Sequence, residues 1–282
     1  MTPIEIALTV LLSILGVLLL GFLVWVFLTA PRGTRGKMKK FTSVRYAHRG
    51  LHGDGAPENS LTAFGRACDR GYGIELDVRL SKSGELVVFH DETLSRVCGI
   101  DGKVSDFTAE ELSKIPLSDS SDTVPTLREV LALVGGRVPL LIELKRGHGE
   151  GSVAKRFLEE IKDYSGEYIV ESFNPFELRT VRRARPDLFL GMLSARYTKD
   201  EKYRGKPLFR MLERLRLNFL VRPDFIAYDY KDWNVTALRA VKKIFNPPFF
   251  AWTVKSEEDE AFARLHGFDT VIFEQYTPDV NG

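Results

Sequence analysis

The sequence predicts an α/β protein: a (β/α)8 TIM barrel with a small inserted subdomain, preceded by a single transmembrane helix. Three observations support this prediction. The first forty residues contain a long uncharged apolar run, the other 242 residues match the roughly 250 of such a barrel, and strand-length apolar segments alternate there with amphipathic ones. We therefore divide the chain into an anchor with a basic juxtamembrane segment, 1–40, and a barrel domain, 41–282.

The composition excludes several classes of protein. The chain has 282 residues, with 40 Lys+Arg against 38 Asp+Glu and two cysteines. A net charge of +2 gives no basic excess for a nucleic-acid binder, and two cysteines cannot build a disulfide scaffold or a cysteine-rich zinc module. The positive charge is local, because residues 1–40 hold five basic residues against one acidic residue. The oligomeric state is left open.

The N-terminal segment is typical of a membrane anchor, and we expect its helix at about 5–30. Residues 6–30 are uncharged, and 25 residues form a helix of about 37 Å, enough for a bilayer core of about 30 Å. A cleaved signal peptide is the competing interpretation, but the segment before the run has Glu5 and no Lys or Arg. Basic residues follow the run: Arg32, Arg35, Lys37, Lys39 and Lys40.

By the positive-inside rule, this charge asymmetry predicts a single-pass membrane protein whose large C-terminal domain is cytoplasmic. The basic segment is either a topology signal alone or also a contact with anionic lipid headgroups.

The barrel domain contains nine apolar segments of strand length. They are 44–48, 73–80, 85–90, 137–144, 168–172, 188–193, 225–229, 249–254 and 269–273. Periodicity and capping residues predict helices over 59–71, 127–134, 152–164, 175–185, 207–219, 234–245 and 256–266.

The second and third of these segments are expected to pair as an antiparallel hairpin. Only about four residues around Ser83-Gly84 separate them, too few for a parallel crossover, so eight strands remain for the barrel. A two-residue loop at Ser83-Gly84 would place Asp77 opposite His90 and on the same face as Glu75. A slip of one residue would change that pairing.

Two further segments stand out. Residues 91–126 contain turn residues and no long apolar run, so we expect a small insertion over one end of the barrel. Residues 199–222 hold eight basic residues against three acidic ones, with an apolar stripe through Leu208 and Leu212. Either a solvated barrel helix or a contact with the membrane surface explains this segment.

Polar residues at the ends of the first three barrel strands form the candidate site. In a barrel, ligand-binding residues lie at the carboxyl ends of strands. They are His48 and Arg49 after the first strand, Glu75 and Asp77 in the second, and Glu143 and Lys145 in the third. Each alone is usually structural, and E-x-D and E-x-K pairs are usually salt bridges. Together, three carboxylates suit a hard divalent cation such as Mg²⁺ or Ca²⁺, and two histidines, with His90 as the second, could act as general base and acid.

At these residues the sequence resembles the glycerophosphodiester phosphodiesterase family of the phosphatidylinositol-phospholipase-C-like phosphodiesterases. The resemblance runs from about Ala47 to the C-terminus through YAHRGLHGDGAPENSLTAF, GIELDVRLSKSGELVVFHDETLSR, LLIELK, ESFNP and AWTV. It implies one divalent metal, Mg²⁺ or Ca²⁺ with Mn²⁺ as a third candidate, held by Glu75, Asp77 and Glu143. It also implies His48 and His90 as the acid/base pair. The substrate-binding residues that it implies are Arg49, Lys145, Glu58, Asn59, Phe173 and Trp252.

The resemblance implies hydrolysis of a glycerophosphodiester to glycerol 3-phosphate and an alcohol, in glycerol and lipid metabolism. The alternatives are lysophospholipase D-type action on membrane lysophospholipids or another lipid-linked diester, and a membrane-bound pseudoenzyme scaffold. The chain departs from the family pattern at Ser60, at Val97-Cys98-Gly99, and at Phe273-Glu274-Gln275 after the last strand. The other histidines, His52, His148 and His266, have no matching position and are interpreted as loop or surface groups.

Overall fold

Eight parallel strands close into a barrel in the computed structural model, which describes residues 1–147 and 152–279. The strand order β1-β9-β8-β7-β6-β5-β4-β2 is closed by pairing of β1 with β2, so the predicted fold class is confirmed. The barrel strands are β1 (Tyr46–Ala47), β2 (Gly73–Leu80), β4 (Leu140–Leu144), β5 (Tyr168–Ser172), β6 (Leu190–Ser194), β7 (Phe225–Asp229), β8 (Phe249–Val254) and β9 (Thr270–Phe273).

Amphipathic helices surround these strands. The helices are α3 (Leu61–Arg70), α6 (Leu127–Val134), α7 (Val153–Glu160), α8 (Pro175–Ala184), α9 (Pro207–Glu213), α10 (Thr236–Phe245) and α11 (Glu257–Leu265). Several begin at a side-chain cap, such as Ser60 at α3 and Thr126 at α6, where Glu129 completes a capping box. Caps of this kind satisfy backbone N–H groups that the first turn leaves unpaired.

Apolar side chains at alternate strand positions fill the barrel interior. Residues that precede the first strand close one end of it. Short helical segments η1 (Arg35–Met38) and α2 (Lys39–Thr42) precede the first strand, and Met38 and Phe41 from them are buried against Tyr46 and Leu141. Phe41 also meets Phe189 edge to face at 5.8 Å. This plug lies at the amino-terminal end of the strands, which leaves the carboxyl end for the site.

The hairpin is present, but the predicted register was wrong by one residue. Strand β3 (Leu86–Val88) pairs antiparallel with β2, with Val78 opposite Val88, so that Asp77 faces Phe89 and not His90. The loop has three residues, 82–84, instead of two, and its last residue, Gly84, has a φ of 81°. Three-residue hairpin loops commonly end in a left-handed residue, a conformation that glycine adopts without strain.

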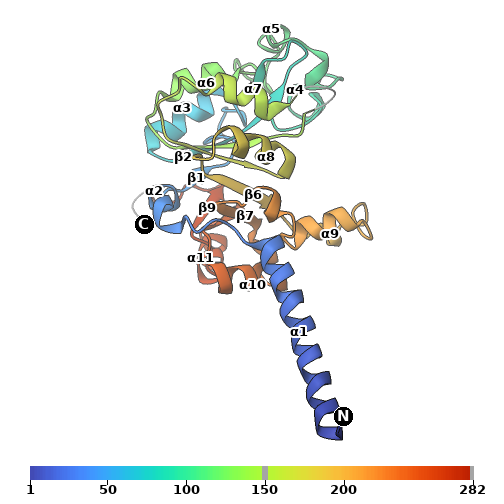
Figure 1. The fold of residues 1–282 in the computed structure, drawn as a ribbon. Helices are drawn as coiled ribbons and strands as arrows, with labels where there is room; N and C mark the ends of the chain where they lie inside the picture. Colours follow the sequence, from blue (N-terminus) through green and yellow to red (C-terminus); the bar gives the residue numbers. More distant parts are fainter. Residues whose placement is uncertain (148–151, 280–282) are drawn as a thin grey trace.

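The insertion after the hairpin contains α4 (Ser95–Cys98), η2 (Val104–Asp106) and α5 (Ala109–Leu112). Its buried side chains, including Leu94, Leu112 and Leu117, form a small apolar cluster with Val87 and Phe89 of the hairpin. Figure 1 shows these elements at the end of the molecule opposite the long N-terminal helix. The hairpin therefore serves as the base on which the insertion packs.

Helix α1 (Pro3–Thr29) extends away from the barrel (Figure 1). Among the described helices it is the one long and apolar enough to cross a membrane, and its apolar stretch has no buried residue. Its last turn docks on the barrel at η4 (Asn218–Leu220): Asn218 Nδ2 donates to the carbonyl of Thr29 (2.8 Å), and Arg222 Nη1 donates to that of Ala30 (3.1 Å). These donors satisfy carbonyls that the helix end leaves unpaired.

The segment 207–219 does not form the single helix that its apolar stripe predicted. Helix α9 ends at Glu213, Leu215 adopts a φ of 57°, and the chain then forms η4. The early end brings Asn218 under the last turn of α1. Leu212 and Leu215 of the stripe are buried, whereas Leu208 remains 50% exposed.

Candidate active site

Three adjacent strands bring buried carboxylates to one level of the barrel. In the parallel register, Asp77 of β2 is the neighbour of Glu143 of β4, and Glu143 is the neighbour of Glu171 of β5. Glu75 lies two residues before Asp77 and shares its face. All four residues are at most 6% exposed. Buried carboxylates are costly unless they are paired, protonated or bound to a cation.

Ligand atoms of Glu75, Asp77 and Glu143 lie within 4.8 Å of one another. The Lys145 ammonium stands between two of them, 2.7 Å from Asp77 Oδ1 and 2.6 Å from Glu143 Oε2. Burial, then Asp77 and Glu143, raise the pKa of Glu75 well above its usual range. Burial also raises the pKa of Glu143, to about 7, although Lys145 opposes the shift. Burial disfavours the Asp77 carboxylate too, but Lys145, His90 and Arg49 outweigh it and lower the pKa of Asp77.

This donor set fits a divalent cation. The three carboxylates are hard oxygen ligands of the kind that Mg²⁺ and Ca²⁺ prefer, and their mutual repulsion would be relieved by a positive ion. Asn59 adds a further oxygen: its Nδ2 donates to Asp77 Oδ2 (2.9 Å), while its buried Oδ1 has no hydrogen-bond partner among the described residues. The acidic triad could therefore bind a metal.

His48 follows β1 and is held by an acidic partner. Its Nδ1 lies 2.7 Å from Glu274 Oε2, so Nδ1 donates and Nε2 is left toward Glu75 Oε2, 4.0 Å away. Burial lowers the pKa of His48, whereas the hydrogen bond that it donates to Glu274 opposes that shift. The ring is consequently a neutral base near pH 7, with one defined free nitrogen.

His90, two residues after β3, has the same kind of partner. Its Nδ1 lies 2.6 Å from Asp91 Oδ1, and its carbonyl accepts from Nε (2.9 Å) and Nη2 (2.7 Å) of Arg79. Burial lowers its pKa to about 4, although Asp77 raises it. Asp77 pairs with Phe89 and not with His90, but strand β3 ends at Val88. His90 still lies close enough to Asp77 for that carboxylate to raise its pKa.

Arg49 links the first loop to the carboxylates. Its backbone N–H donates to Glu75 Oε2 (2.9 Å), its Nη1 donates to Glu58 Oε1 (2.7 Å), and its Nε lies 3.6 Å from Asp77 Oδ2. Arg96 of the insertion donates to both oxygens of Glu58, at 2.6 and 2.8 Å. Glu58 therefore holds the guanidinium of Arg49 and the insertion in one network, and Arg49 provides fixed positive charge beside the acidic cluster.

The apolar residues that the sequence singled out lie together. Phe173 meets Trp252 edge to face, with ring centroids 5.5 Å apart, and meets Tyr197 at 6.5 Å. Trp252 Nε1 is buried without a hydrogen-bond partner in the part of the chain that the structure describes. These rings belong to the segments that follow β5 and β6 and to β8.

Sequence reasoning missed several residues of the site. Glu171 lies in the quoted ESFNP motif but was not selected; it is 1% exposed, and burial and Glu75 raise its pKa well above its usual range. Glu274 was seen only as a departure, yet it holds His48. His52 is not a plain surface group, because its Nε2 lies 3.7 Å from Glu274 Oε2. His266 is the C-cap of α11 and is half-buried against the rings of Trp233 and Phe262, and His148 lies outside the described residues.

An acidic triad and two carboxylate-bound histidines at the carboxyl end of a parallel barrel form a site suited to the hydrolysis of a phosphoric diester. Residues 48–276 match the model of the glycerophosphoryl diester phosphodiesterase family. The chain belongs to this family of phosphoric diester hydrolases.

Individual relatives agree. A glycerophosphodiester phosphodiesterase of Caldanaerobacter subterraneus is 40% identical over 158 residues, which cover 52% of this chain and 65% of that protein, just under two thirds of its length. The Bacillus subtilis protein YhdW is 31% identical over 240 residues, covering 80% and 92% of the two chains. The structure of an Oleispira antarctica phosphodiesterase in complex with its product sn-glycerol-3-phosphate matches at a TM-score of 0.67 and 25% identity, covering 83% and 93%.

Proposed function

We propose that this chain hydrolyses glycerophosphodiesters to glycerol 3-phosphate and an alcohol. One observation carries the proposal: two histidines, each with Nδ1 bound to a carboxylate, flank a buried cluster of three carboxylates and two cations. The glycerol 3-phosphate in the Oleispira antarctica complex supports a substrate with a glycerol-phosphate end.

In the proposed reaction, a glycerol hydroxyl gives its proton to one histidine, and its oxygen forms a bond to phosphorus. The bond from phosphorus to the leaving oxygen breaks as the other histidine protonates that oxygen. Water then opens the cyclic phosphate with the two roles reversed. Burial lowers the pKa of both rings, which suits the base. The negative charge of the bound diester would raise the pKa of the ring that must arrive protonated.

The fixed charges of the site suit this chemistry. Arg49 and Lys145 would bind the phosphate or the glycerol, because a guanidinium and an ammonium donate charge-assisted hydrogen bonds to phosphoryl oxygens. Glu75, Asp77 and Glu143 would hold a divalent ion, which, when bound, supplies a Lewis acid that lowers the pKa of the glycerol hydroxyl and neutralises phosphoryl charge.

Substitution of the histidines tests the assignment. We expect His48→Ala and His90→Ala each to lower turnover of glycerophosphoethanolamine by about 10² to 10⁴, the range for general acid–base groups. His266→Ala, which removes a histidine at the C-cap of α11 and outside the carboxylate cluster, is the matched control and should retain full activity. The measurement is release of glycerol 3-phosphate, with circular dichroism to check folding. Near-wild-type turnover in both His48→Ala and His90→Ala would sink the proposed mechanism.

Calorimetry tests the metal site. We expect Mg²⁺, Ca²⁺ or Mn²⁺ to bind the wild-type chain at one site, and Glu75→Ala to weaken that binding, because it removes one of three carboxylates. Exhaustive treatment with a chelator should abolish hydrolysis, and the tightest-binding ion should restore it. Equal binding by the wild type and Glu75→Ala would place the ion elsewhere.

A lipid substrate is the second candidate, and a chain of aromatic rings favours it. Next to the wall formed by Phe173 and Trp252, the ring centroid of Tyr197 lies 5.5 Å from that of Phe209 of α9. The ring centroid of Phe209 lies 4.2 Å from that of Tyr203. This row of rings would accommodate an acyl chain, as lysophospholipase D-type action requires. A pseudoenzyme scaffold is the non-catalytic alternative. It would be favoured if the wild-type chain hydrolysed no diester, so that the histidine variants had no activity to lose.

We further propose that α1 anchors the chain in a membrane as a single pass, with the barrel on the cytoplasmic side. The support is the length, composition and exposure of α1 together with the basic residues that follow it. Resistance to alkaline carbonate extraction, and protease access to the barrel from the cytoplasmic side alone, would test both parts.

A further inference from the structure

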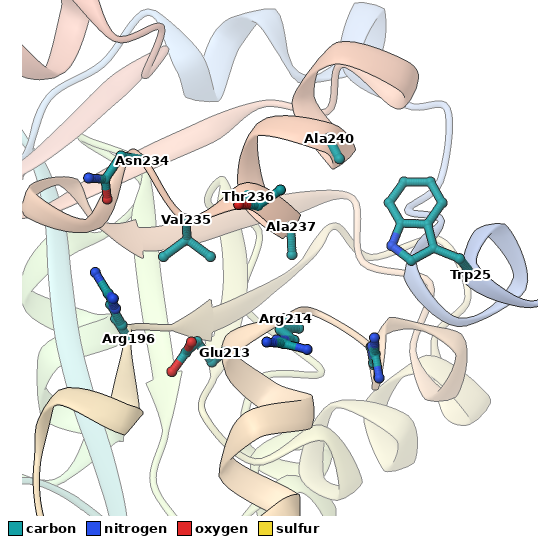
Figure 2. A pocket seen from close by; sticks show the side chains of 10 residues that line it. Trp25, Arg196, Glu213, Arg214, Asn234, Val235, Thr236, Ala237 and Ala240 are labelled. Carbon is teal, nitrogen blue, oxygen red and sulfur yellow. The ribbon is translucent and has the colours of Figure 1, made fainter. Parts of the chain in front are cut away.

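A cavity whose lining includes no residue of the carboxylate cluster lies where α1 meets the barrel. It has a volume of about 650 Å³, and its walls come from the end of α1, the segment that follows α9, and the first turns of α10 (Figure 2). Trp25 lies at one side of it and Glu213 and Arg214 at another. Nothing in the proposed hydrolysis uses this cavity.

The cavity is lined by three arginines without acidic partners. They are Arg196, Arg214 and Arg216. Within residues 1–147 and 152–279, none of the three guanidinium groups has a carboxylate oxygen within 4.0 Å, whereas Arg49, Arg96 and Arg182 elsewhere on the barrel each have one. Glu213 also lines the cavity, but its Oε2 accepts from the N–H (3.0 Å) and the hydroxyl (2.7 Å) of Thr198. Three guanidinium groups against one carboxylate therefore leave the lining of the cavity with a net positive charge.

The opposite wall adds donors. Helix α10 begins at Thr236, and its N-cap, Val235, has no side chain that could accept a hydrogen bond. The first N–H groups of the helix are thus left without a side-chain cap beside the arginines, and such groups favour anions. Guanidinium groups and helix N–H groups together are suited to a phosphate or another oxyanion.

The position of the cavity along α1 sets the level at which it lies in a membrane. From Ile4 to Trp25 the helix rises about 32 Å at about 1.5 Å per residue, close to the thickness of a bilayer core. Trp25 would therefore lie at the membrane–water interface, the place where tryptophan is enriched in membrane helices. Its ring stacks on Phe245 of α10 at 5.9 Å, which fixes the cavity at that depth.

The basic residues that directly follow α1 are largely occupied elsewhere. Arg32 Nη1 donates to the carbonyl of Pro186 (2.8 Å), Arg35 pairs with Asp269, and Lys40 pairs with Glu167 (2.5 Å). These contacts fasten the linker to the barrel. The unpaired arginines of the cavity are better placed to bind lipid at the interface.

We propose that this cavity binds the headgroup of an anionic phospholipid of the leaflet from which α1 emerges. The proposal rests on the membrane anchorage proposed above and not on the hydrolytic activity. A headgroup in the cavity would contact Arg214 and Arg216 while its acyl chains lie along α1. It would hold the barrel at a fixed height and rotation over the bilayer.

Native mass spectrometry of the full chain in detergent tests the proposal. Dioleoylphosphatidylserine and dioleoylphosphatidylcholine are titrated separately, since neither offers a free glycerol hydroxyl to the active site. We expect phosphatidylserine to bind with a stoichiometry of one and more tightly than phosphatidylcholine. The double variant R214Q/R216Q should weaken phosphatidylserine binding by about tenfold or more, as the loss of charge-assisted hydrogen bonds would.

The matched control is K206Q/R210Q, which removes the same charge from α9 and its N-cap residue but lies outside the cavity. It should bind phosphatidylserine as the wild type does. Wild-type binding in R214Q/R216Q, equal weakening in K206Q/R210Q, or displacement of the lipid by millimolar inorganic phosphate would each overturn the headgroup site. Circular dichroism and hydrolysis of glycerophosphoethanolamine should be unchanged in both variants.

Failures of the separate proposals can be told apart. A chain that binds phosphatidylserine through the arginines but hydrolyses no diester contradicts the proposed activity and leaves the headgroup site standing. Complete extraction of the wild-type chain from membranes by alkaline carbonate contradicts the anchor, and the headgroup site with it.

Discussion

Glu274 is the residue whose role the structure changes most. Its carboxylate lies 2.7 Å from His48 Nδ1, 3.7 Å from His52 Nε2 and 2.7 Å from the ammonium of Lys255. These partners, His48 first, lower the pKa of Glu274, so it is ionised at neutral pH. It fixes the tautomer of His48 and directs Nε2 toward the carboxylates, and we treat it as a positioning residue.

Glu274→Gln should therefore lower turnover less than His48→Ala does, by about tenfold against the 10² to 10⁴ of a general acid–base group. The hydrogen bond and charge of Glu274 raise the pKa of His48, so their loss should lower it. Whichever limb of the pH–rate profile His48 governs should move to lower pH. A purely structural role for Glu274 would lower activity without moving that limb.

The sequence allowed most site residues to be selected, because motif residues at strand ends must converge in a barrel. Glu143 and Asp77 could be placed side by side once their strands were taken as parallel neighbours. Glu171 and Glu274 could not be selected in that way. Each is a single acid in or after an ordinary strand, and its role depends on which side chain of a distant segment faces it.

At the scale of elements, the hairpin and α9 show what sequence patterns do not predict. Alternating apolar residues predicted both strands of the hairpin, but loops of two and three residues fit the same letters, and the choice shifts the register by one. The apolar stripe over 207–219 fitted a helix. Its residues are instead divided between α9, a left-handed turn at Leu215 and η4. In that arrangement Asn218 caps the end of α1. That contact joins two segments that are far apart in the sequence, so the sequence pattern could not predict it.

The linker after α1 depends on one buried acid, Asp224. It accepts from the hydroxyl of Thr34 (2.9 Å) and the N–H of Leu190 (2.9 Å), and it pairs with Arg182. Asp224→Ala leaves Arg182 half-buried without its partner, so we expect a loss of about 3 kcal/mol or more in the free energy of unfolding. Thermal unfolding in detergent measures it. Asp187→Ala, which breaks an exposed pair, is the control and should cost under about 1 kcal/mol; equal melting of the two variants would contradict the expected role of Asp224.

At the scale of the whole molecule, the docking of α1 fixes how the barrel stands over a membrane. The contacts of Asn218, Arg222, Trp25 and Asp224 leave little freedom between the helix and the barrel. Figure 1 shows α9 projecting from the barrel on the side where α1 leaves it, with the insertion at the opposite end. If α1 spans a bilayer, α9 lies near its surface and the insertion lies far from it.

This arrangement predicts that α9 matters for lipid substrates and not for soluble ones. Leu208 is 50% exposed next to Phe209, one of the rings in the row that leads toward Trp252. Leu208→Glu puts a charge where the apolar tip of α9 would enter the interface, so hydrolysis of lysophosphatidylethanolamine in vesicles should fall by about tenfold, the equivalent of about 1.4 kcal/mol. Hydrolysis of glycerophosphoethanolamine should be unchanged, because the substitution is remote from the carboxylates.

The matched control is Ile100→Glu, which places the same charge on the exposed surface of the insertion, where 36% of Ile100 is accessible. It should leave both reactions unchanged. A second comparison removes residues 1–27 but keeps Thr29 and the linker, since Thr29 is buried and its carbonyl accepts from Asn218. If lipid hydrolysis depends on membrane placement, this truncation and Leu208→Glu should impair the same reaction. Should the chain cleave the soluble diester alone, with neither change altering its rate in the presence of vesicles, then α9 is a solvated barrel helix and α1 determines only where the enzyme resides.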